Sequence, residues 1–391
     1  MKLPAAFLLL FTLLFGATPV APAFADPAQA RVLDTADLVE NGPAADRITV
    51  VLIGDGYTAD DLPRFRAQAE ATWRAISSVE PFRTYARFFD VKRVDLVSPH
   101  SGIGDGSPLG MHFDCAGTPR LLCADDGDVS HWVGPAVGPR YVIALADSTQ
   151  YGGAGGPGVT TLSAGSADAD RIIEHEMGHT VGGLGDEYDA APADDSFPNL
   201  SAQDADAMTA AHAKWWRWLG AADPTGGVVG AYRSGNGLYR PTRDSIMRTL
   251  GGVYNLPSRE AIVESLYRQL RPVDCADPAP QLGPVTPGRV LRVVPLPLAD
   301  GRRMTVSWTV GDRPAPVGAL RDGGLALDTG ALGLGPDSRL PVRAVVTDGT
   351  PWVRDEMFRQ ARMRGQVEWA VGRFAPGSQE TPRSRPANGR W

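Results

Sequence analysis

The sequence has no excess of basic residues and, beyond its first residues, no long apolar run. Its 38 Lys and Arg are outnumbered by 45 Asp and Glu, which gives a formal net charge of −7. Nucleic acids and anionic membranes attract concentrated Lys and Arg, so this composition argues against both as partners. No segment after residue 25 approaches the roughly 20 apolar residues that a membrane span needs. We therefore expect no stable insertion into a membrane.

Cysteine is also scarce, with three residues in the whole chain. Cys115 and Cys123 are separated by a short stretch that contains a Gly and a Pro. We interpret them as a disulfide that closes a small loop and stabilises the fold by about 2–3 kcal/mol. Cys275 is then left over, and a buried free thiol is its expected state. No pattern in the sequence supports a zinc ribbon or a thiol nucleophile.

The first residues have the organisation of a secretory signal peptide. Lys2 precedes an apolar run from Phe7 to Phe15, and Ala23-Phe24-Ala25 forms an A-x-A cleavage site. We expect cleavage after Ala25 and a secreted product, extracellular or periplasmic, with an uncleaved anchor as the alternative. Loss of residues 1–25 removes the charge of Lys2 and changes the net charge to −8.

The following part of the chain alternates strand and helix patterns. Residues 48–53 are continuous and β-branched, as in a strand buried on both faces, and residues 88–97 and 141–146 have the pattern of two more strands. Apolar residues at helical spacing predict a helix over 58–78. We therefore predict an α/β (α+β) layer with right-handed crossovers.

A glycine-dense stretch at residues 152–158 precedes a short predicted strand at 159–162. It lacks the Lys-Ser/Thr pair of a phosphate loop, so we interpret it as a flexible rim. The strand after it is expected to be an exposed edge that pairs with a peptide backbone. Further helices are expected from Ser166 or Asp168 to about 181, over 203–219 and over 258–270. We interpret the three Trp of the 203–219 segment as packing residues, with contact to carbohydrate or membrane as the alternative.

The composition changes after residue 272, where a Pro-rich stretch leads into short alternating runs. These runs lie at residues 289–294, 304–310, 341–347 and 365–371. They predict a small all-β, sandwich-like module. We therefore divide the chain into a signal peptide (1–25), a catalytic domain (26–275), a β-sandwich-like accessory domain (280–375) and a disordered tail (376–391).

The chemistry of the chain is indicated by His175-Glu176-Met177-Gly178-His179. Two histidines four residues apart lie on one face of a helix, where both can bind one metal ion. Glu176, next to the first ligand, can reach a metal-bound water without binding the metal. This is the arrangement of a zinc peptidase, with two ligands and a general base. Two ordinary surface histidines on a helix are the alternative.

A catalytic zinc takes three protein ligands, so one ligand remains to be found. In the common pattern HExxHxxGxxH it lies three residues after the glycine, but that position here is Gly185. Asp186 is the first carboxylate after the Gly182-Gly183 pair, and we predict it as the third ligand. Glu187 and a residue distant in the sequence are the alternatives, and each of the two acids could instead orient a histidine through an N–H···O bond.

The stretch HEMGHTVGGLGDEY, residues 175–188, resembles the motif of the immunoglobulin-A peptidase family of bacterial zinc metallopeptidases. Other segments between about residues 45 and 270 are similar to that family in order and spacing, namely residues 52–58, 80–82, 120–123, 197–201, the Trp cluster and 239–248. The resemblance implies a metzincin-like catalytic domain with a mixed sheet and an active-site helix, Zn²⁺ as cofactor, and Met247 as an apolar floor beneath the metal.

We therefore predict a secreted, monomeric zinc endopeptidase that acts on proteins or peptides, with Glu176 as general base. The charge that develops on the substrate needs a second stabilising group, and the candidates are Tyr188, Tyr239, Tyr254 and Arg248. Two other classes stay open. One is an exported adhesion or binding protein with a zinc fold and no turnover, and the other is a zinc amidase that acts on cell-wall peptides.

Overall fold

In the computed structural model of the chain, residues 29–335 and 338–372 are described. The expected signal peptide and the expected disordered tail lie outside these residues. The described chain is a mixed α/β structure with several sheets. None of its described helices is long and apolar enough to cross a membrane.

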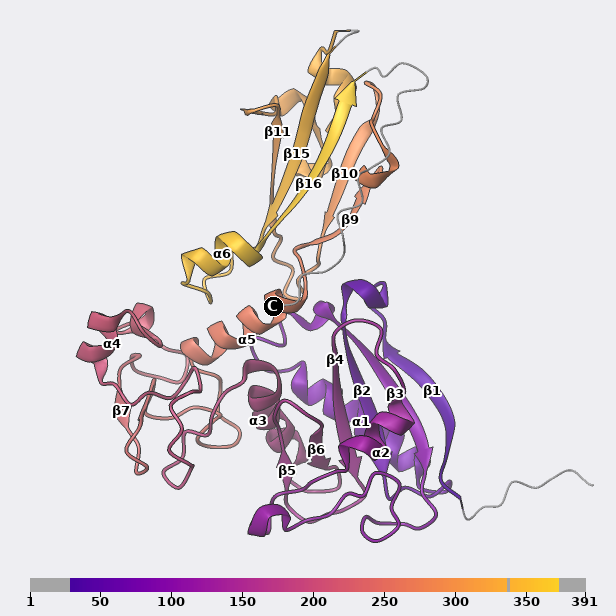
Figure 1. Cartoon of the computed structure of the whole chain (residues 1–391), viewed down its shortest axis with the longest axis vertical. Helices are drawn as coiled ribbons and strands as arrows, with labels where there is room; N and C mark the ends of the chain where they lie inside the picture. Colours follow the sequence, from indigo (N-terminus) through magenta and orange to yellow (C-terminus); the bar gives the residue numbers. More distant parts are fainter. Residues whose placement is uncertain (1–28, 336–337, 373–391) are drawn as a thin grey trace, which may run out of the picture.

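A six-stranded mixed sheet forms the centre of the larger part of the molecule (Figure 1). Its order is β1-β3-β2-β4-β6-β5. The strands are β1 (Arg31–Val39), β2 (Ile48–Asp55), β3 (Phe89–Val97), β4 (Arg140–Ala146), β5 (Gly153–Ala154) and β6 (Thr160–Ser163). The four inner strands are parallel, whereas β1 and β5 run antiparallel at the two edges. Every residue of β2 is buried, as its continuous apolar sequence predicts.

Successive residues of β2 point to opposite faces of the sheet, and all of them are buried. Helices accordingly cover both faces. On one face, α1 (Leu62–Ile76), α3 (Ala169–Gly182) and α5 (Leu256–Gln269) share a hydrophobic core with Val50 and Leu52. On the other face, α2 (Asp126–Val133) packs on Val51 and Ile53 through Val129. α3 contacts both α1 and α5, so it lies in the middle of its layer.

Between α3 and α5 the chain forms a smaller region with α4 (Ala205–Ala211), β7 (Tyr232–Arg233) and β8 (Tyr239–Arg240). The helix expected over 203–219 is wrong beyond α4, because His212 adopts a left-handed φ of 51° and ends it. Trp215 and Trp218, each 2% exposed, pack in a separate cluster with Met208. Packing is therefore the correct interpretation of these two tryptophans.

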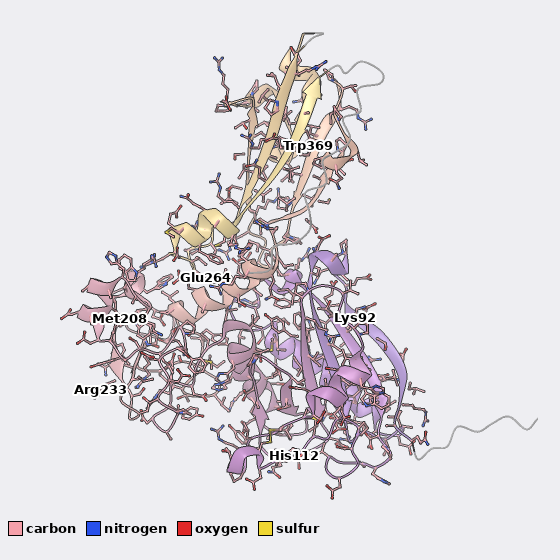
Figure 2. The ribbon with its side chains drawn as sticks, in the orientation of Figure 1. Lys92, His112, Met208, Arg233, Glu264 and Trp369 are labelled. Atoms are coloured by element: carbon pink, nitrogen blue, oxygen red, sulfur yellow. A yellow bond between two sulfur atoms is a disulfide. The ribbon has the colours of Figure 1, made fainter. Side chains whose placement is uncertain are left out.

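The C-terminal part contains two four-stranded antiparallel sheets, with the orders β13-β14-β10-β9 and β12-β11-β15-β16. The elements are β9 (Val273–Asp277), β10 (Val290–Pro295), β11 (Thr305–Val310), β12 (Arg313–Pro314), β13 (Leu320–Arg321), β14 (Ala326–Asp328), β15 (Arg339–Thr347), α6 (Glu356–Arg362) and β16 (Arg364–Gly372). The four runs expected as strands correspond to β10, β11, β15 and β16. Trp308 and Trp369 stack in the core of this part (Figure 2).

The C-terminal part is fixed to the larger part by buried polar contacts near α5. Asp348, which is 2% exposed, accepts hydrogen bonds from the hydroxyls of Tyr85 and Tyr267 at 2.6 and 2.7 Å. Arg47 forms an ion pair with Asp274 at 2.8 Å. Two aspartates of the C-terminal part are therefore bound by longer side chains of the larger part at the junction.

Three local expectations are wrong. α1 begins at Leu62 instead of residue 58. The strand β6 is internal and buried, and the edge strand is β5, which comes from the glycine stretch expected as a flexible rim. The glycines allow this because a Cβ on Gly153 would lie 2.7 Å from Ile172 of α3. Cys275 is exposed and not buried, since it lies on β9 at the edge of its sheet.

Candidate active site

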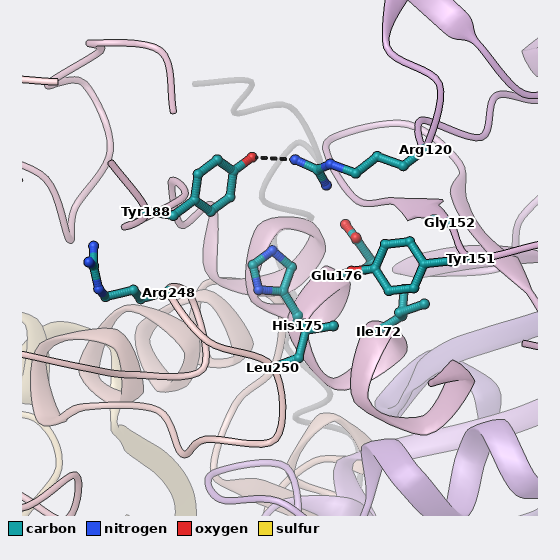
Figure 3. Close-up of a pocket in the computed structure, with 10 residues that line it drawn as sticks. Arg120, Tyr151, Gly152, Ile172, His175, Glu176, Tyr188, Arg248 and Leu250 are labelled. Carbon is teal, nitrogen blue, oxygen red and sulfur yellow. Dashed lines mark hydrogen bonds between the residues drawn. The ribbon is translucent and has the colours of Figure 1, made fainter. Parts of the chain in front are cut away.

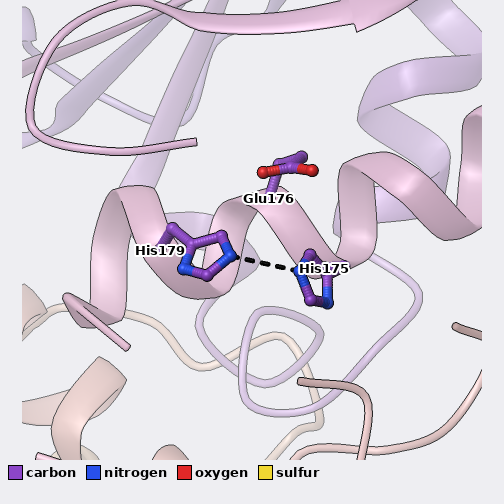
Figure 4. A group of neighbouring side chains, drawn as sticks. All are labelled: His175, Glu176 and His179. Carbon is purple, nitrogen blue, oxygen red and sulfur yellow. Dashed lines mark hydrogen bonds between the residues drawn. The ribbon is translucent and has the colours of Figure 1, made fainter. Parts of the chain in front are cut away.

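The expected active-site helix is α3. Its cap is Asp168, one of the two expected caps, and it ends at Gly183, whose φ of 58° is a left-handed conformation that favours glycine. His175 and His179 lie one turn apart on the same side of this helix (Figure 4). Their ring centroids are 4.8 Å apart.

Backbone carbonyls orient both imidazole rings. Nδ1 of His175 donates to the carbonyl of Ile246 at 2.9 Å, and Nδ1 of His179 donates to the carbonyl of Leu184 at 2.6 Å. A carbonyl can only accept, so Nδ1 carries the proton and each neutral ring keeps a lone pair on Nε2. The two Nε2 atoms are 3.1 Å apart. Both lone pairs can therefore be directed at the same metal ion.

The chain reverses after α3 and brings Asp186 to the histidines. Its Oδ1 lies 3.0 Å from Nε2 of His175 and 3.3 Å from Nε2 of His179. The reversal is held by a hydrogen bond from the Leu184 amide to the Gly178 carbonyl at 3.1 Å. Burial alone would raise the pKa of Asp186, but its close contacts with the two histidines outweigh burial and lower the pKa.

The donor atoms of His175, His179 and Asp186 fit a tetrahedral metal ion. Zinc bonds of about 2.0–2.1 Å imply ligand atoms about 3.3 Å apart in a tetrahedron. The three separations here are 3.0, 3.1 and 3.3 Å. Ligand atoms of His175, Glu176 and His179 also lie within 4.8 Å of one another. The set with Glu176 is looser, so Asp186 suits the third ligand position better.

Glu176 lies beside this group and is 8% exposed. Burial raises the pKa of its carboxyl, and the two histidines offset this effect only in part. A carboxylate with a raised pKa is a better proton acceptor near neutral pH. The edge strand passes close to it, since a Cβ on Gly153 would lie 3.6 Å from its Cγ. Glu176 is therefore a shielded carboxylate next to the candidate metal ligands.

Glu187, the alternative third ligand, is completely buried and engaged elsewhere. Its carboxylate accepts hydrogen bonds from Ser245 Oγ at 2.7 Å and Asn199 Nδ2 at 3.0 Å. Its amide donates to the carbonyl of Met247 at 2.8 Å. Met247 is itself fully buried against α3, where a Cβ on Gly178 would lie 2.6 Å from its Sδ. Glu187 thus fastens the segment that lies beneath the histidines.

A cleft passes the histidines and Glu176 (Figure 3). Tyr188 lines it, and its hydroxyl donates to Asp186 Oδ2 at 2.9 Å and accepts from Nη2 of Arg120 at 2.8 Å. Burial and the Asp186 carboxylate raise the pKa of Tyr188, which keeps the hydroxyl protonated. Tyr188 is therefore the one tyrosine of the expected candidates that touches this group of residues.

The other three candidates for stabilising substrate charge are used differently. The hydroxyl of the fully buried Tyr254 donates to the carbonyl of Glu174. Arg248 lines the cleft, but both of its terminal nitrogens bind Asp189, at 3.1 and 3.0 Å. Tyr239 is not among the residues that line the described cleft.

The sequence model of the IgA peptidase M64 family matches residues 36–227. Residues 36–227 belong to this family. The expected relationship is confirmed, and the protein is a metallopeptidase, a hydrolase of peptide bonds. M64 metallopeptidases are metal-dependent, in agreement with the histidine and carboxylate donors on and after α3. No curated protein matches the chain.

In this M64 peptidase, Arg120 lines the cleft, although its sequence pattern indicated no role for it. It lies in the loop closed by the Cys115–Cys123 disulfide, which is present as expected. Thr161 Oγ1 of β6 donates to the carbonyl of Leu122 at 2.6 Å, so this loop is fastened to the sheet beside the cleft. The one sequence signal was that residues 120–123 resemble the family, which identified the segment but not its position.

Proposed function

We propose that the protein is a secreted zinc endopeptidase that hydrolyses peptide bonds of extracellular proteins. The observation that carries the proposal is the convergence of two imidazole nitrogens and one carboxylate oxygen, with a buried carboxylate beside them at the wall of a cleft. We assign His175, His179 and Asp186 as the zinc ligands and Glu176 as the general base.

Zinc, when bound, supplies a water of lowered pKa and polarises the carbonyl of the scissile bond. Glu176 takes a proton from the attacking water while the new C–O bond forms and the carbonyl electron pair moves to its oxygen. When the C–N bond breaks, Glu176 gives the proton to the leaving amine. The raised pKa of Glu176 suits both directions of this transfer.

The edge strand and the cleft support a polypeptide substrate. β5 ends the six-stranded sheet next to Glu176, and Gly153 lines the cleft. A substrate strand could add to this edge through backbone hydrogen bonds, with little demand on its side chains. This supports a protein substrate in preference to a small compound.

Secretion and domain organisation belong to the same proposal. The Cys115–Cys123 disulfide suits an oxidising compartment, in agreement with the signal peptide expected at residues 1–25. We assign residues 26–275 to a metzincin-like catalytic domain and residues 280–375 to a β-sandwich-like accessory domain. The two antiparallel sheets of the C-terminal part support the second assignment.

The test is Glu176→Gln, which removes the base and keeps every proposed ligand. We expect one zinc per chain, an unchanged fold and a turnover lowered by about 10²–10⁴-fold on a protein substrate. The wild type should lose activity with a chelator and regain it with zinc. A panel of casein, gelatin and muropeptides distinguishes an endopeptidase from a cell-wall amidase. Near-wild-type turnover by the metal-loaded variant would contradict the proposal.

A further inference from the structure

The group that stabilises the negative charge on the substrate has to offer free N–H or O–H donors inside the cleft. Tyr188 does not, because its hydroxyl already donates to Asp186 and accepts from Arg120. Arg248 is neutralised by its ion pair with Asp189 at 3.0 Å, and three of its five N–H groups are already hydrogen-bonded. Tyr254 donates to the carbonyl of Glu174 in α3. Of the three arginines that line the cleft, Arg268 is paired with Glu264 at 2.7 Å, which leaves Arg120 as the one without an ion pair to a described residue.

Arg120 is positively charged and largely uncommitted. Among the described residues it forms no ion pair, and its one side-chain hydrogen bond is the one from Nη2 to Tyr188. A guanidinium has five N–H donors in a fixed plane, so four remain for a ligand. The residue lines the cleft together with His175 and Glu176, and Figure 3 shows its guanidinium on the same side as the Glu176 carboxylate.

The backbone of the loop that carries Arg120 is held in a defined position. The disulfide closes the loop that carries it, and β6 binds the loop through the Thr161–Leu122 hydrogen bond. On the opposite side of the cleft, the ring of Tyr188 faces the guanidinium at 5.5 Å. A donor that is already oriented loses little entropy when it binds developing charge, which is the condition for an effective oxyanion site.

We propose that Arg120 is a catalytic residue that stabilises the oxygen of the scissile carbonyl as it becomes negatively charged. The inference rests on the proposed function. As water attacks the carbonyl carbon, Glu176 takes a proton of the water and the C=O electron pair moves to the carbonyl oxygen. The free N–H groups of Arg120 donate hydrogen bonds to this negatively charged oxygen. The pair returns to the carbonyl when the C–N bond breaks. Tyr188 is a positioning residue, since it holds both Arg120 and the second oxygen of Asp186.

The experiment compares the metal-loaded wild type with Arg120→Gln and Arg120→Lys. Loss of one oxyanion donor costs about 10²–10³-fold in kcat, so we expect that loss in Arg120→Gln with little change in KM and in zinc content. Arg120→Lys should be intermediate. The matched control is Arg171→Gln, an arginine on α3 whose side chain is 63% exposed. It should keep wild-type kinetics.

A binding measurement separates charge stabilisation from a general structural effect. A phosphinic peptide carries the tetrahedral negative charge, whereas a peptide with an N-methylated scissile amide is neutral. In Arg120→Gln we expect the affinity for the phosphinic peptide to fall by about the same factor as kcat, while the affinity for the neutral peptide stays within about threefold. Equal losses for both ligands would overturn the proposal.

A second variant distinguishes a direct role of Arg120 from an indirect role through Tyr188. If Arg120 only orients Tyr188, then Tyr188→Phe reproduces the full loss and Arg120→Gln adds nothing in that background, which overturns the proposal. We expect Arg120→Gln to lower kcat in the Tyr188→Phe background as well. Should Arg120→Gln fold poorly, Arg120→Ala with added methylguanidinium replaces it, and recovery of kcat is the expected result.

Different results would contradict the role of Arg120 and the proposed function. Full activity in Arg120→Gln together with an inactive Glu176→Gln overturns the role of Arg120 and leaves the zinc peptidase intact. Full activity in Glu176→Gln overturns the mechanism on which both rest.

Discussion

Asp186 and Glu187 are adjacent in the chain, yet their carboxylates serve different parts of the site. Asp186 Oδ1 lies 3.0 Å from Nε2 of His175. Glu187 is fully buried and accepts a hydrogen bond from Ser245 at 2.7 Å. The two acids were competing ligand candidates in the sequence, and their surroundings in the structure separate them.

We expect Asp186→Ala to lose most of its metal and Glu187→Gln to keep it. The first change removes one of three proposed ligands, whereas loss of a group behind the ligands typically weakens metal binding by about 10–100-fold. Glu187→Gln should instead lower the free energy of unfolding, because Gln replaces one acceptor oxygen with a donor. Zinc content after dialysis and urea unfolding measure the two effects. A Glu187 variant without zinc beside an Asp186 variant with one zinc per chain would reverse the two roles.

The helix that carries the candidate metal ligands could be predicted because the spacing of its histidines is a local feature. A four-residue spacing places His175 and His179 on one helix face in any fold. Asp186 could be predicted as well, because the sequence shows that it is the first carboxylate after the Gly182-Gly183 pair. Arg120 could not be found in this way, because it reaches the cleft only through the packing of the disulfide loop on β6.

The outer elements were harder to predict than the core. β1 was not expected, because most of its residues are exposed and its sequence has no clear apolar period. β5 was interpreted as a flexible rim, because glycine is rare in strands; here glycine is required by the close approach of α3. The break after α4 depends on a left-handed His212, for which the sequence carries no strong signal.

Gly178→Ala should destabilise the protein, although alanine normally favours a helix over glycine by about 1 kcal/mol. A Cβ at this position would lie 2.6 Å from Sδ of Met247 and 2.9 Å from the ring of Tyr254. Overpacking of this kind costs about 1–3 kcal/mol. Thermal unfolding of Gly178→Ala, Met247→Ala and the double variant forms the test. If the two changes are simply additive, the contact with Met247 does not explain the glycine.

Asp348→Ala should lower stability and leave catalysis in the folded protein unchanged. The substitution leaves the buried hydroxyls of Tyr85 and Tyr267 without their acceptor, at a cost of about 1–3 kcal/mol for each. Urea unfolding gives the loss, and kcat/KM at 25 °C shows whether the C-terminal part contributes to chemistry. Glu356→Ala, an exposed change on α6, is the control. A fall in kcat/KM of the folded Asp348 variant would link the C-terminal part to the active site.

Glu264 makes stability depend on pH at the junction between α5 and the C-terminal part (Figure 2). Burial, with a contribution from Glu260, raises the pKa of Glu264 from 4.5 to about 7. The folded protein therefore binds this proton more tightly than the unfolded chain does. The stabilisation is complete below about pH 4.5 and is lost as the pH rises to about 7.

Glu264→Gln replaces the carboxyl with a neutral group of the same shape. At pH 8 we expect it to raise the free energy of unfolding by on the order of 1–3 kcal/mol, since one pKa unit corresponds to about 1.4 kcal/mol. At pH 4.5 the gain should disappear, because the wild-type carboxyl is then neutral in the folded state. Urea unfolding from pH 4.5 to 8 measures the difference, with the exposed Glu356→Gln as control. A loss of stability at pH 8 would mean that the ion pair of Glu264 with Arg268, at 2.7 Å, outweighs the cost of burial.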